Sequence, residues 1–135
     1  METSPASSAL ILLWDKKSYW WQRRALDDDS HPACLDFAAG GGIEPGETPA
    51  QAAERELEEE LGVTGLTLEA LGARVLDGEV CALFAAPLPK AWRLGPEVAE
   101  LLPLSLTALM ALPREQLHPQ LAQWLGSLPT QAHNC

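Results

Sequence analysis

A glycine-rich loop that leads directly into an acidic helix constrains the fold of this chain more than any other segment. Thr48 is a good helix N-cap, Pro49 suits the first helical position, and Gln51 completes a capping box. Gly62 suits the left-handed position at which a helix stops. Because both ends carry these signals, the sequence predicts one helix over residues 49–61.

Glutamates occupy five of seven consecutive positions in this helix and fall into two groups. At roughly 100° per residue, Glu56, Glu59 and Glu60 project together beside the apolar stripe, whereas Glu54 and Glu58 point to solvent. Like charges one turn apart repel each other. A hard divalent cation with oxygen ligands would offset that repulsion, and a solvated acidic face with basic partners is the alternative. The helix by itself leaves both open.

The rest of the chain reads as short strands and helices of a single α/β domain over residues 1–135. We expect strands at 9–14 and 18–25 (joined by a turn at 15–17), 66–74 and 79–89, and short helices at 105–112 and 119–128. Residues 26–33 and 38–47 are predicted as loops, 90–103 show no clear preference, and 1–8 and 129–135 are expected to be flexible.

Composition excludes several classes of function. Nine basic residues against nineteen acidic ones give a formal charge of −10, which disfavours nucleic acid polymers and anionic membranes. A small phosphorylated substrate is still compatible, because a bound metal ion reverses the local charge. The three cysteines, Cys34, Cys81 and Cys135, form no CxxC pair, so we expect a reducing, cytoplasmic setting without a structural zinc site.

The segment from Gly41 to Val63, GGIEPGETPAQAAERELEEELGV, matches a known pattern at every specified position. The pattern is G-x5-E-x7-R-E-U-x-E-E-x-G-U, in which U is apolar, and it lies on a loop followed by a helix, as the motif requires. The matching residues are Gly41, Glu47, Arg55, Glu56, Leu57, Glu59, Glu60, Gly62 and Val63. This is the Nudix box, and the chain resembles the Nudix hydrolase family.

The resemblance implies a fold, a reaction and a set of site residues. The fold is an α/β/α sandwich with a mixed central sheet, and the reaction is hydrolysis of a diphosphate bond in a nucleoside diphosphate linked to another group. The resemblance assigns Mg²⁺ or Mn²⁺ to Glu56, Glu59, Glu60 and the carbonyl of Gly40. It also implies that Arg55 orients the Glu56 carboxylate, which is itself a candidate base. Glu47 would brace the loop against the helix.

The residues before the box resemble one branch of the family. The stretch QRRALDDDSHPACLDFAAGG, residues 22–41, is similar to the isopentenyl-diphosphate-isomerase-like branch. Isomerases of that branch need a cysteine as proton donor at the position of Gly40, and Cys34 lies six residues too early. A hydrolase is therefore favoured over an isomerase.

Two neighbouring arginines in the same stretch are candidates for substrate binding. Arg23 and Arg24 alternate across a strand, so only one of them can face a cleft. Contact with a substrate phosphate and a surface ion pair with acidic residues both remain open for that arginine. His31 and His118 each precede a proline, and we expect both to be surface residues.

The residue that deprotonates the attacking water lies outside the box in many relatives. The segment GPEVAELLPLSLTAL, residues 95–109, resembles the family segment that carries such a glutamate. Glu97 is the first candidate for an additional ligand or base, and Glu100 is the second. The alternative is that both glutamates simply solvate a turn.

Three functions are compatible with these features. A metal-dependent pyrophosphohydrolase is favoured, because all the acids of the box are present. A nucleotide-sensing module without catalysis would be expected to have lost one of them, and an isomerase would need the missing cysteine. The expected partner is a small phosphorylated substrate, in particular a nucleotide. A homodimer remains open.

Overall fold

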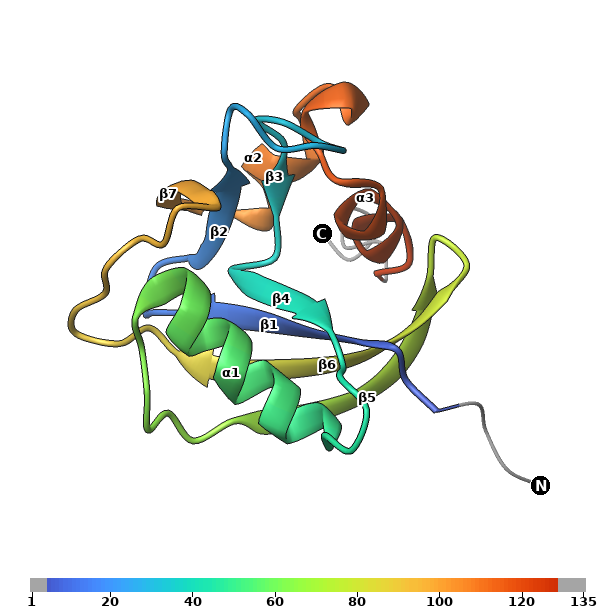
Figure 1. Cartoon of the computed structure of the whole chain (residues 1–135). Helices are drawn as coiled ribbons and strands as arrows, with labels where there is room; N and C mark the ends of the chain where they lie inside the picture. The colour runs from blue at the N-terminus through green and yellow to red at the C-terminus, as the bar shows by residue number, and fades with distance from the viewer. Residues whose placement is uncertain (1–4, 129–135) are drawn as a thin grey trace.

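The computed structural model describes residues 5–128 and places a seven-stranded mixed β-sheet at the centre, with helices on both faces (Figure 1). The strands are β1 (Ser8–Trp14), β2 (Tyr19–Arg24), β3 (Leu35–Asp36), β4 (Ala39–Gly42), β5 (Glu69–Leu76), β6 (Glu79–Pro87) and β7 (Val98–Leu104). The helices are α1 (Pro49–Leu61), α2 (Leu106–Met110) and α3 (Pro119–Gly126), with a 3₁₀ turn at Arg114–Gln116. The predicted α/β sandwich with a mixed sheet is confirmed.

Strand β1 is the central strand and is buried on both faces. Its apolar side chains alternate between two cores: Ile11 and Leu13 lie in the core that contains α1, and Leu10 and Leu12 lie in the core that contains α3. β1 runs parallel to β6 and antiparallel to β2 and β4. A continuous apolar run such as ALILL is typical of a strand that is covered on both sides.

The sheet divides beside β1, and this division positions the candidate site. Since β6 occupies one edge of β1, β2 and β4 share the other edge: β4 pairs with residues 8–11 and β2 pairs with Leu13 and Trp14. Side chains of both strands, of α1 and of the start of α3 line one cavity. The cavity therefore brings together residues that are far apart in the chain, such as Ser8 and Gln120.

Helix α1 has the capping signals that the sequence predicted. The side chain of Thr48 accepts a hydrogen bond from the backbone N–H of Gln51, and the Gln51 side chain accepts one from the N–H of Thr48. Gly62 ends the helix with a φ of 65°. Leu57 and Leu61 are buried against the sheet. The predicted bounds, 49–61, are confirmed.

Helix α3 covers the opposite face of the sheet through an aromatic cluster. The ring of Trp124 lies 6.3 Å from that of Trp21 on β2 and 5.6 Å from that of Phe37. Leu121 and Leu125 are buried in the same core. This packing fixes the first turn of α3 beside the cavity.

Two expectations about the elements need correction. The glycine-rich segment predicted as a loop contains β4, because its backbone pairs with β1 although glycine has low strand propensity. Residues 98–103, within the segment 90–103 for which the sequence showed no clear preference, belong to β7, which pairs with β2. The segment up to Ser8, expected to be flexible, includes the first residue of β1, and the Ser7 N–H donates to the carbonyl of Val80.

The remaining expectation of flexible ends, at residues 1–4 and 129–135, lies outside the described residues. Between residues 5 and 128, no helix is long and apolar enough to cross a membrane.

Candidate active site

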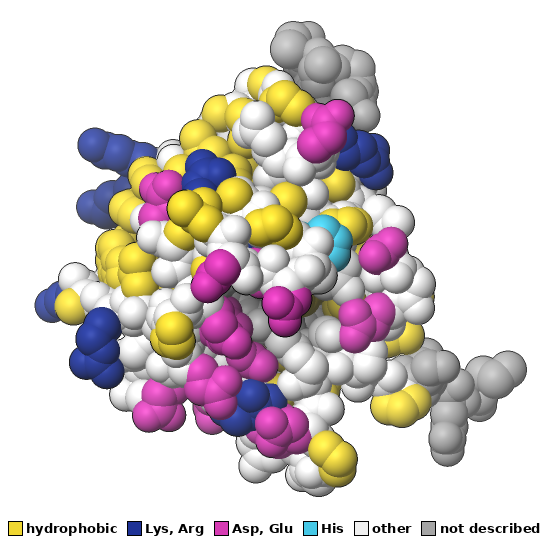
Figure 2. Space-filling view, turned by 45° about the horizontal axis from the view of Figure 1, so that its top comes forward, with side chains coloured by type: hydrophobic (Ala, Val, Ile, Leu, Met, Phe, Trp, Pro, Cys, Tyr) yellow, Lys and Arg dark blue, Asp and Glu magenta, His cyan; other side chains and the backbone are white. Residues whose placement is uncertain are grey.

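A cavity of about 310 Å³ lies between α1, the divided edge of the sheet and the first turn of α3. Its wall is strongly acidic, and Figure 2 shows Asp and Glu side chains gathered on this side of the molecule. The acidic residues that line it are Asp28, Asp36, Glu56, Glu59, Glu60 and Glu97. The lining also contains the neutral polar side chains of Ser8, Gln22, His118 and Gln120, and one arginine, Arg24.

Two glutamates of α1 are buried at this wall. Glu56 and Glu60 are only 8% and 7% exposed. The amide of Gln22 on β2 donates to Glu60 Oε1 at 2.9 Å, and the backbone N–H of Gly40 donates to the same oxygen at 3.3 Å. A Cβ atom on Gly41 would lie 2.2 Å from Glu56 Oε2, so the box glycine leaves the space that this carboxylate occupies.

The burial of these carboxylates has an electrostatic cost. Desolvation raises the pKa of Glu60 well above its usual range, and the adjacent Glu56 carboxylate adds to the rise. The partners of Glu60 are neutral donors, Gln22 and Gly40. Glu60 is thus a carboxylate that neutral donors hold beside a second carboxylate, Glu56. A bound cation would stabilise the charged form of such a pair.

Arg55 connects the loop of the box to the helix. Its Nε and Nη2 donate to the two oxygens of Glu47 at 2.7 and 2.9 Å, Nη2 also donates to the carbonyl of Gly42, and Nη1 donates to Glu56 Oε2 at 3.1 Å. The Arg55 contact, with a further hydrogen bond from the backbone of Glu44, lowers the pKa of Glu47 to about 2. Glu47 therefore braces the loop, and Arg55 holds one oxygen of Glu56.

Glu59 lines the same wall, on the helix face that the periodicity predicted, but it is more exposed than Glu56 and Glu60. Its side chain is 54% exposed and its Oε2 lies 3.6 Å from Arg55 Nη1. Within residues 5–128, no three His, Cys, Asp or Glu side chains are already gathered as a metal-binding group. Glu56 and Glu60 are thus in buried positions, while Glu59 reaches the cavity from the solvent side.

The two arginines of β2 point to opposite sides of the strand, as the alternation predicts. Arg23 lies outside the cavity, where its Nε donates to Glu100 at 2.9 Å. Arg24 lines the cavity, and its two terminal nitrogens bind Asp28 and Asp36 at 2.9 and 3.0 Å. Its Nε is buried and has no partner among the described residues.

Asp28 anchors this ion pair in a tight loop. Its Oδ1 accepts hydrogen bonds from the backbone N–H groups of Ser30 and His31, and its Oδ2 accepts from Arg24. The His31 and Ser30 donors, together with the Arg24 guanidinium, hold the pKa of Asp28 well below its usual range. Asp28 is therefore ionised at any physiological pH.

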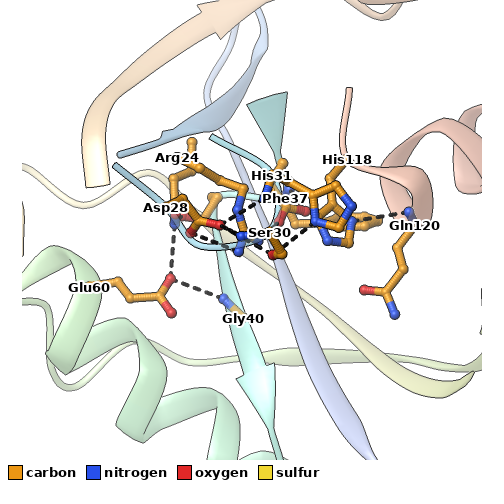
Figure 3. A network of polar contacts seen from close by, with 12 residues as sticks. Arg24, Asp28, Ser30, His31, Phe37, Gly40, Glu60, His118 and Gln120 are labelled. Atoms are coloured by element: carbon orange, nitrogen blue, oxygen red, sulfur yellow. Dashed lines mark hydrogen bonds and ion pairs between the residues drawn. The ribbon is translucent and has the colours of Figure 1, made fainter. Parts of the chain in front are cut away.

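The sequence did not single out the residues that α3 contributes. His118 was expected at the surface, but it is half-buried and lines the cavity next to Gln120 (Figure 3). Its Nδ1 accepts a hydrogen bond from the backbone N–H of Gln120 at 3.1 Å. Ser8 on β1 joins the same wall and binds Glu79, which also binds the Gln120 amide. No local pattern marks these residues, because strand and helix packing alone brings them together.

The structure separates the two glutamates proposed downstream of the box. Glu97, which precedes β7, lines the cavity from an exposed position. Glu100 is on β7 and pairs with Arg23 outside the cavity. The candidate for a further ligand or base is therefore Glu97.

Comparisons with known proteins give relatives by sequence and by fold. An uncharacterized Nudix hydrolase from Yersinia pestis is 40% identical over 65 residues, which cover 48% of this chain and 36% of that protein. Another from Pseudomonas aeruginosa is 42% identical over 69 residues, which cover 48% of this chain and 41% of that protein. The matches thus extend over less than half the length of either relative.

Solved structures share the fold at lower sequence identity. DR0079 from Deinococcus radiodurans has a TM-score of 0.79 with 22% identity, over 88% of this chain and 80% of that one. A model of the NUDIX domain matches residues 4–125, which include the whole box and every residue that lines the cavity. The chain therefore belongs to the Nudix family.

Proposed function

We propose that this protein hydrolyses a diphosphate bond in a nucleoside diphosphate linked to another group, with the help of a divalent metal ion. The observation that carries the proposal is the pair of buried carboxylates, Glu56 and Glu60, at the wall of a 310 Å³ cavity. A buried acid whose hydrogen-bond donors are all neutral, as those of Glu60 are, is expensive unless it serves a function. Membership of the Nudix family supports the reaction class.

The donor set fits the divalent cation that Nudix hydrolases generally use. Glu56, Glu59, Glu60 and the carbonyl of Gly40 would hold Mg²⁺ or Mn²⁺, which both prefer oxygen ligands. Once bound, such an ion would neutralise phosphate oxygens and activate a water molecule for attack on phosphorus.

The side chains around this site have distinct proposed tasks. Arg55 fixes Glu56 by a 3.1 Å contact to Oε2. Gln22 holds Glu60 in place without adding charge. Glu97 is the proposed additional base or ligand, because it lines the cavity and its side chain has no hydrogen-bond or ion-pair partner among the described residues. Arg24 would contact the substrate through the N–H groups that its two aspartates leave free.

The first prediction compares two glutamates of the same helix. Glu60→Gln removes a buried carboxylate of the cavity, whereas Glu58→Gln removes an exposed one. Loss of a residue that only supports a metal ligand costs roughly 10- to 100-fold in activity. We expect Glu60→Gln, which removes a proposed ligand itself, to lower kcat/KM by at least that factor. Glu58→Gln should retain activity. The measurement is Mg²⁺-dependent hydrolysis of a panel of nucleoside triphosphates, sugar nucleotides, ADP-ribose, dinucleotides and dinucleoside polyphosphates.

The same panel separates the competing functions. Equal activity of the two variants would contradict the metal site. Tight nucleotide binding with no turnover of any compound would indicate a sensing module instead. Isomerase activity is disfavoured, because neither Cys34 nor Cys81, the two cysteines among the described residues, lines the cavity.

A further inference from the structure

The cavity has a second end, away from the α1 carboxylates, where α3 begins. Figure 3 shows Glu60 on one side and His118 and Gln120 on the other. This end is formed by His118, Gln120 and Ser8, with the Arg24 ion pair beside it. Since the first end takes the phosphates in the proposed function, the second end faces whatever is joined to them.

The described residues of the second end offer no uncompensated positive charge. Arg24 is the one cation among the described residues that line the cavity, and Asp28 and Asp36 both pair with it. Asp28 stays ionised because Arg24 and the backbone N–H groups of Ser30 and His31 donate to it, so the pairing persists at physiological pH. An additional phosphate or carboxylate placed here would meet net negative charge and be repelled.

His118 contributes a neutral donor and does not add a charge. Its Nδ1 accepts from the Gln120 backbone N–H, so in the neutral ring the proton is on Nε2. Burial lowers the pKa of His118, which favours that neutral form. The Gln120 amide nitrogen donates to Glu79, and its carbonyl oxygen accepts no hydrogen bond from the described residues. The lining of the second end therefore includes a donor on His118 and an acceptor on Gln120.

Among the described residues, the second end also lacks a stacking surface for a nucleobase. Recognition of bases commonly uses the open face of an aromatic ring. Phe37 is the one Phe, Tyr or Trp among the described lining residues, and it is only 1% exposed. The His118 ring already packs against His31 at 4.4 Å. Hydroxyl groups, which both donate and accept, suit the available partners better than a base does.

We propose that the His118–Gln120–Ser8 end of the cavity binds an uncharged, hydroxyl-bearing group joined to the diphosphate, namely a sugar ring, and discriminates against a further phosphate. This inference rests on the proposed function, because it takes the α1 end as the phosphate site. The choice between a sugar and a further phosphate would then depend on the first turn of α3 and on Arg24, whose charge Asp28 and Asp36 neutralise.

The test compares a nucleoside diphosphate hexose with the triphosphate of the same nucleoside. Gln120→Ala should raise KM for the sugar nucleotide about three- to tenfold, the effect of one lost neutral hydrogen bond, with kcat unchanged. KM for the triphosphate should stay the same. Gln116→Ala, at an exposed position of the neighbouring 3₁₀ turn, is the matched control and should change neither.

A second variant tests the charge argument. Asp28→Asn retains the oxygen that accepts from Ser30 and His31 but removes the carboxylate oxygen that binds Arg24. Because Arg24 then loses one of its two carboxylate partners, its positive charge can attract a further phosphate. The kcat/KM for the triphosphate should therefore rise relative to that for the sugar nucleotide. An unchanged ratio, together with an unchanged KM in Gln120→Ala, would overturn the inference while leaving hydrolysis intact.

A binding measurement distinguishes this inference from the proposed function. The rise in Tm on adding each nucleotide with Mg²⁺ reports binding even without turnover. If neither compound is hydrolysed, but the sugar nucleotide raises Tm and Gln120→Ala abolishes that rise, then the proposed hydrolysis fails and the sugar site stands. If the triphosphate raises Tm as much as the sugar nucleotide does, and Gln120→Ala changes neither, the sugar site is wrong.

Discussion

At the scale of single residues, the shape of the cavity depends on Gly41, which has no side chain, as well as on the acidic side chains around it. Gly41 pairs with β1 and lies directly against the Glu56 carboxylate. Gly41 does not have a positive φ, so an alanine could adopt the same backbone conformation. An alanine would instead occupy space that the Glu56 carboxylate fills. A substitution at position 41 therefore tests the site with little effect on the fold.

Gly41→Ala should lower activity strongly and stability little. The new Cβ would lie 2.2 Å from Glu56 Oε2, so the carboxylate must move away from its contact with Arg55. Gly42→Ala is the control, because its nearest heavy atom would be 3.9 Å away. We expect kcat/KM to fall at least tenfold more in the first variant, on the order of the cost of losing an outer contact of a metal site. Equal activity of the two would contradict a role for the Glu56 position.

At the scale of elements, α1 is held by its ends as well as by its buried stripe. Its carboxylates repel one another and it has no basic residue in its last turn to offset its dipole. The capping box at Thr48 satisfies backbone groups at the end that adjoins the loop of the site. Loss of the cap should therefore be measurable.

Thr48→Ala should lower the free energy of unfolding by about 1 kcal/mol, because the N–H of Gln51 loses its acceptor. Thr64→Ala is the matched control, since Thr64 is exposed in the segment after the helix. Urea denaturation of both variants measures the difference. Equal midpoints would mean that the cap contributes nothing to stability.

At the scale of the whole molecule, the two cores have different consequences for the site. The core under α1 supports the carboxylates, and the core under α3 supports the His118–Gln120–Ser8 end of the cavity. The sheet between them is shared, so loosening one core weakens the whole fold. The α3 core, however, determines where the first turn of that helix lies.

Leu121→Ala should be strongly destabilising, by about 2–5 kcal/mol, because Leu121 is completely buried under α3. Leu26→Ala is the same substitution at a residue that is 75% exposed, and its effect should be within about 0.5 kcal/mol. Guanidinium denaturation followed by tryptophan fluorescence measures both. A small loss in Leu121→Ala would show that α3 is not part of the cooperative core.

The sequence by itself determined the elements whose signals are local. The caps of α1, its bounds and the box residues lie within 23 consecutive positions, from Gly41 to Val63, and capping and helical periodicity act over just such distances. The alternation of Arg23 and Arg24 followed from strand geometry alone. The division of the helix into solvent-facing and cavity-facing glutamates followed from the same kind of periodicity.

Only the tertiary structure decided which of these residues are buried and what stands opposite them. Glu56 is buried against Gly41 and Glu60 against Gln22, whereas Glu59 stays exposed. Helical periodicity alone does not predict this difference in burial. β4 exists because β1 offers it backbone partners. His118 reaches the cavity because Trp124, one turn and more further along α3, packs under the sheet. Such contacts join positions far apart in the chain, and pairing over those distances leaves no periodic or capping signal in the residues that make it.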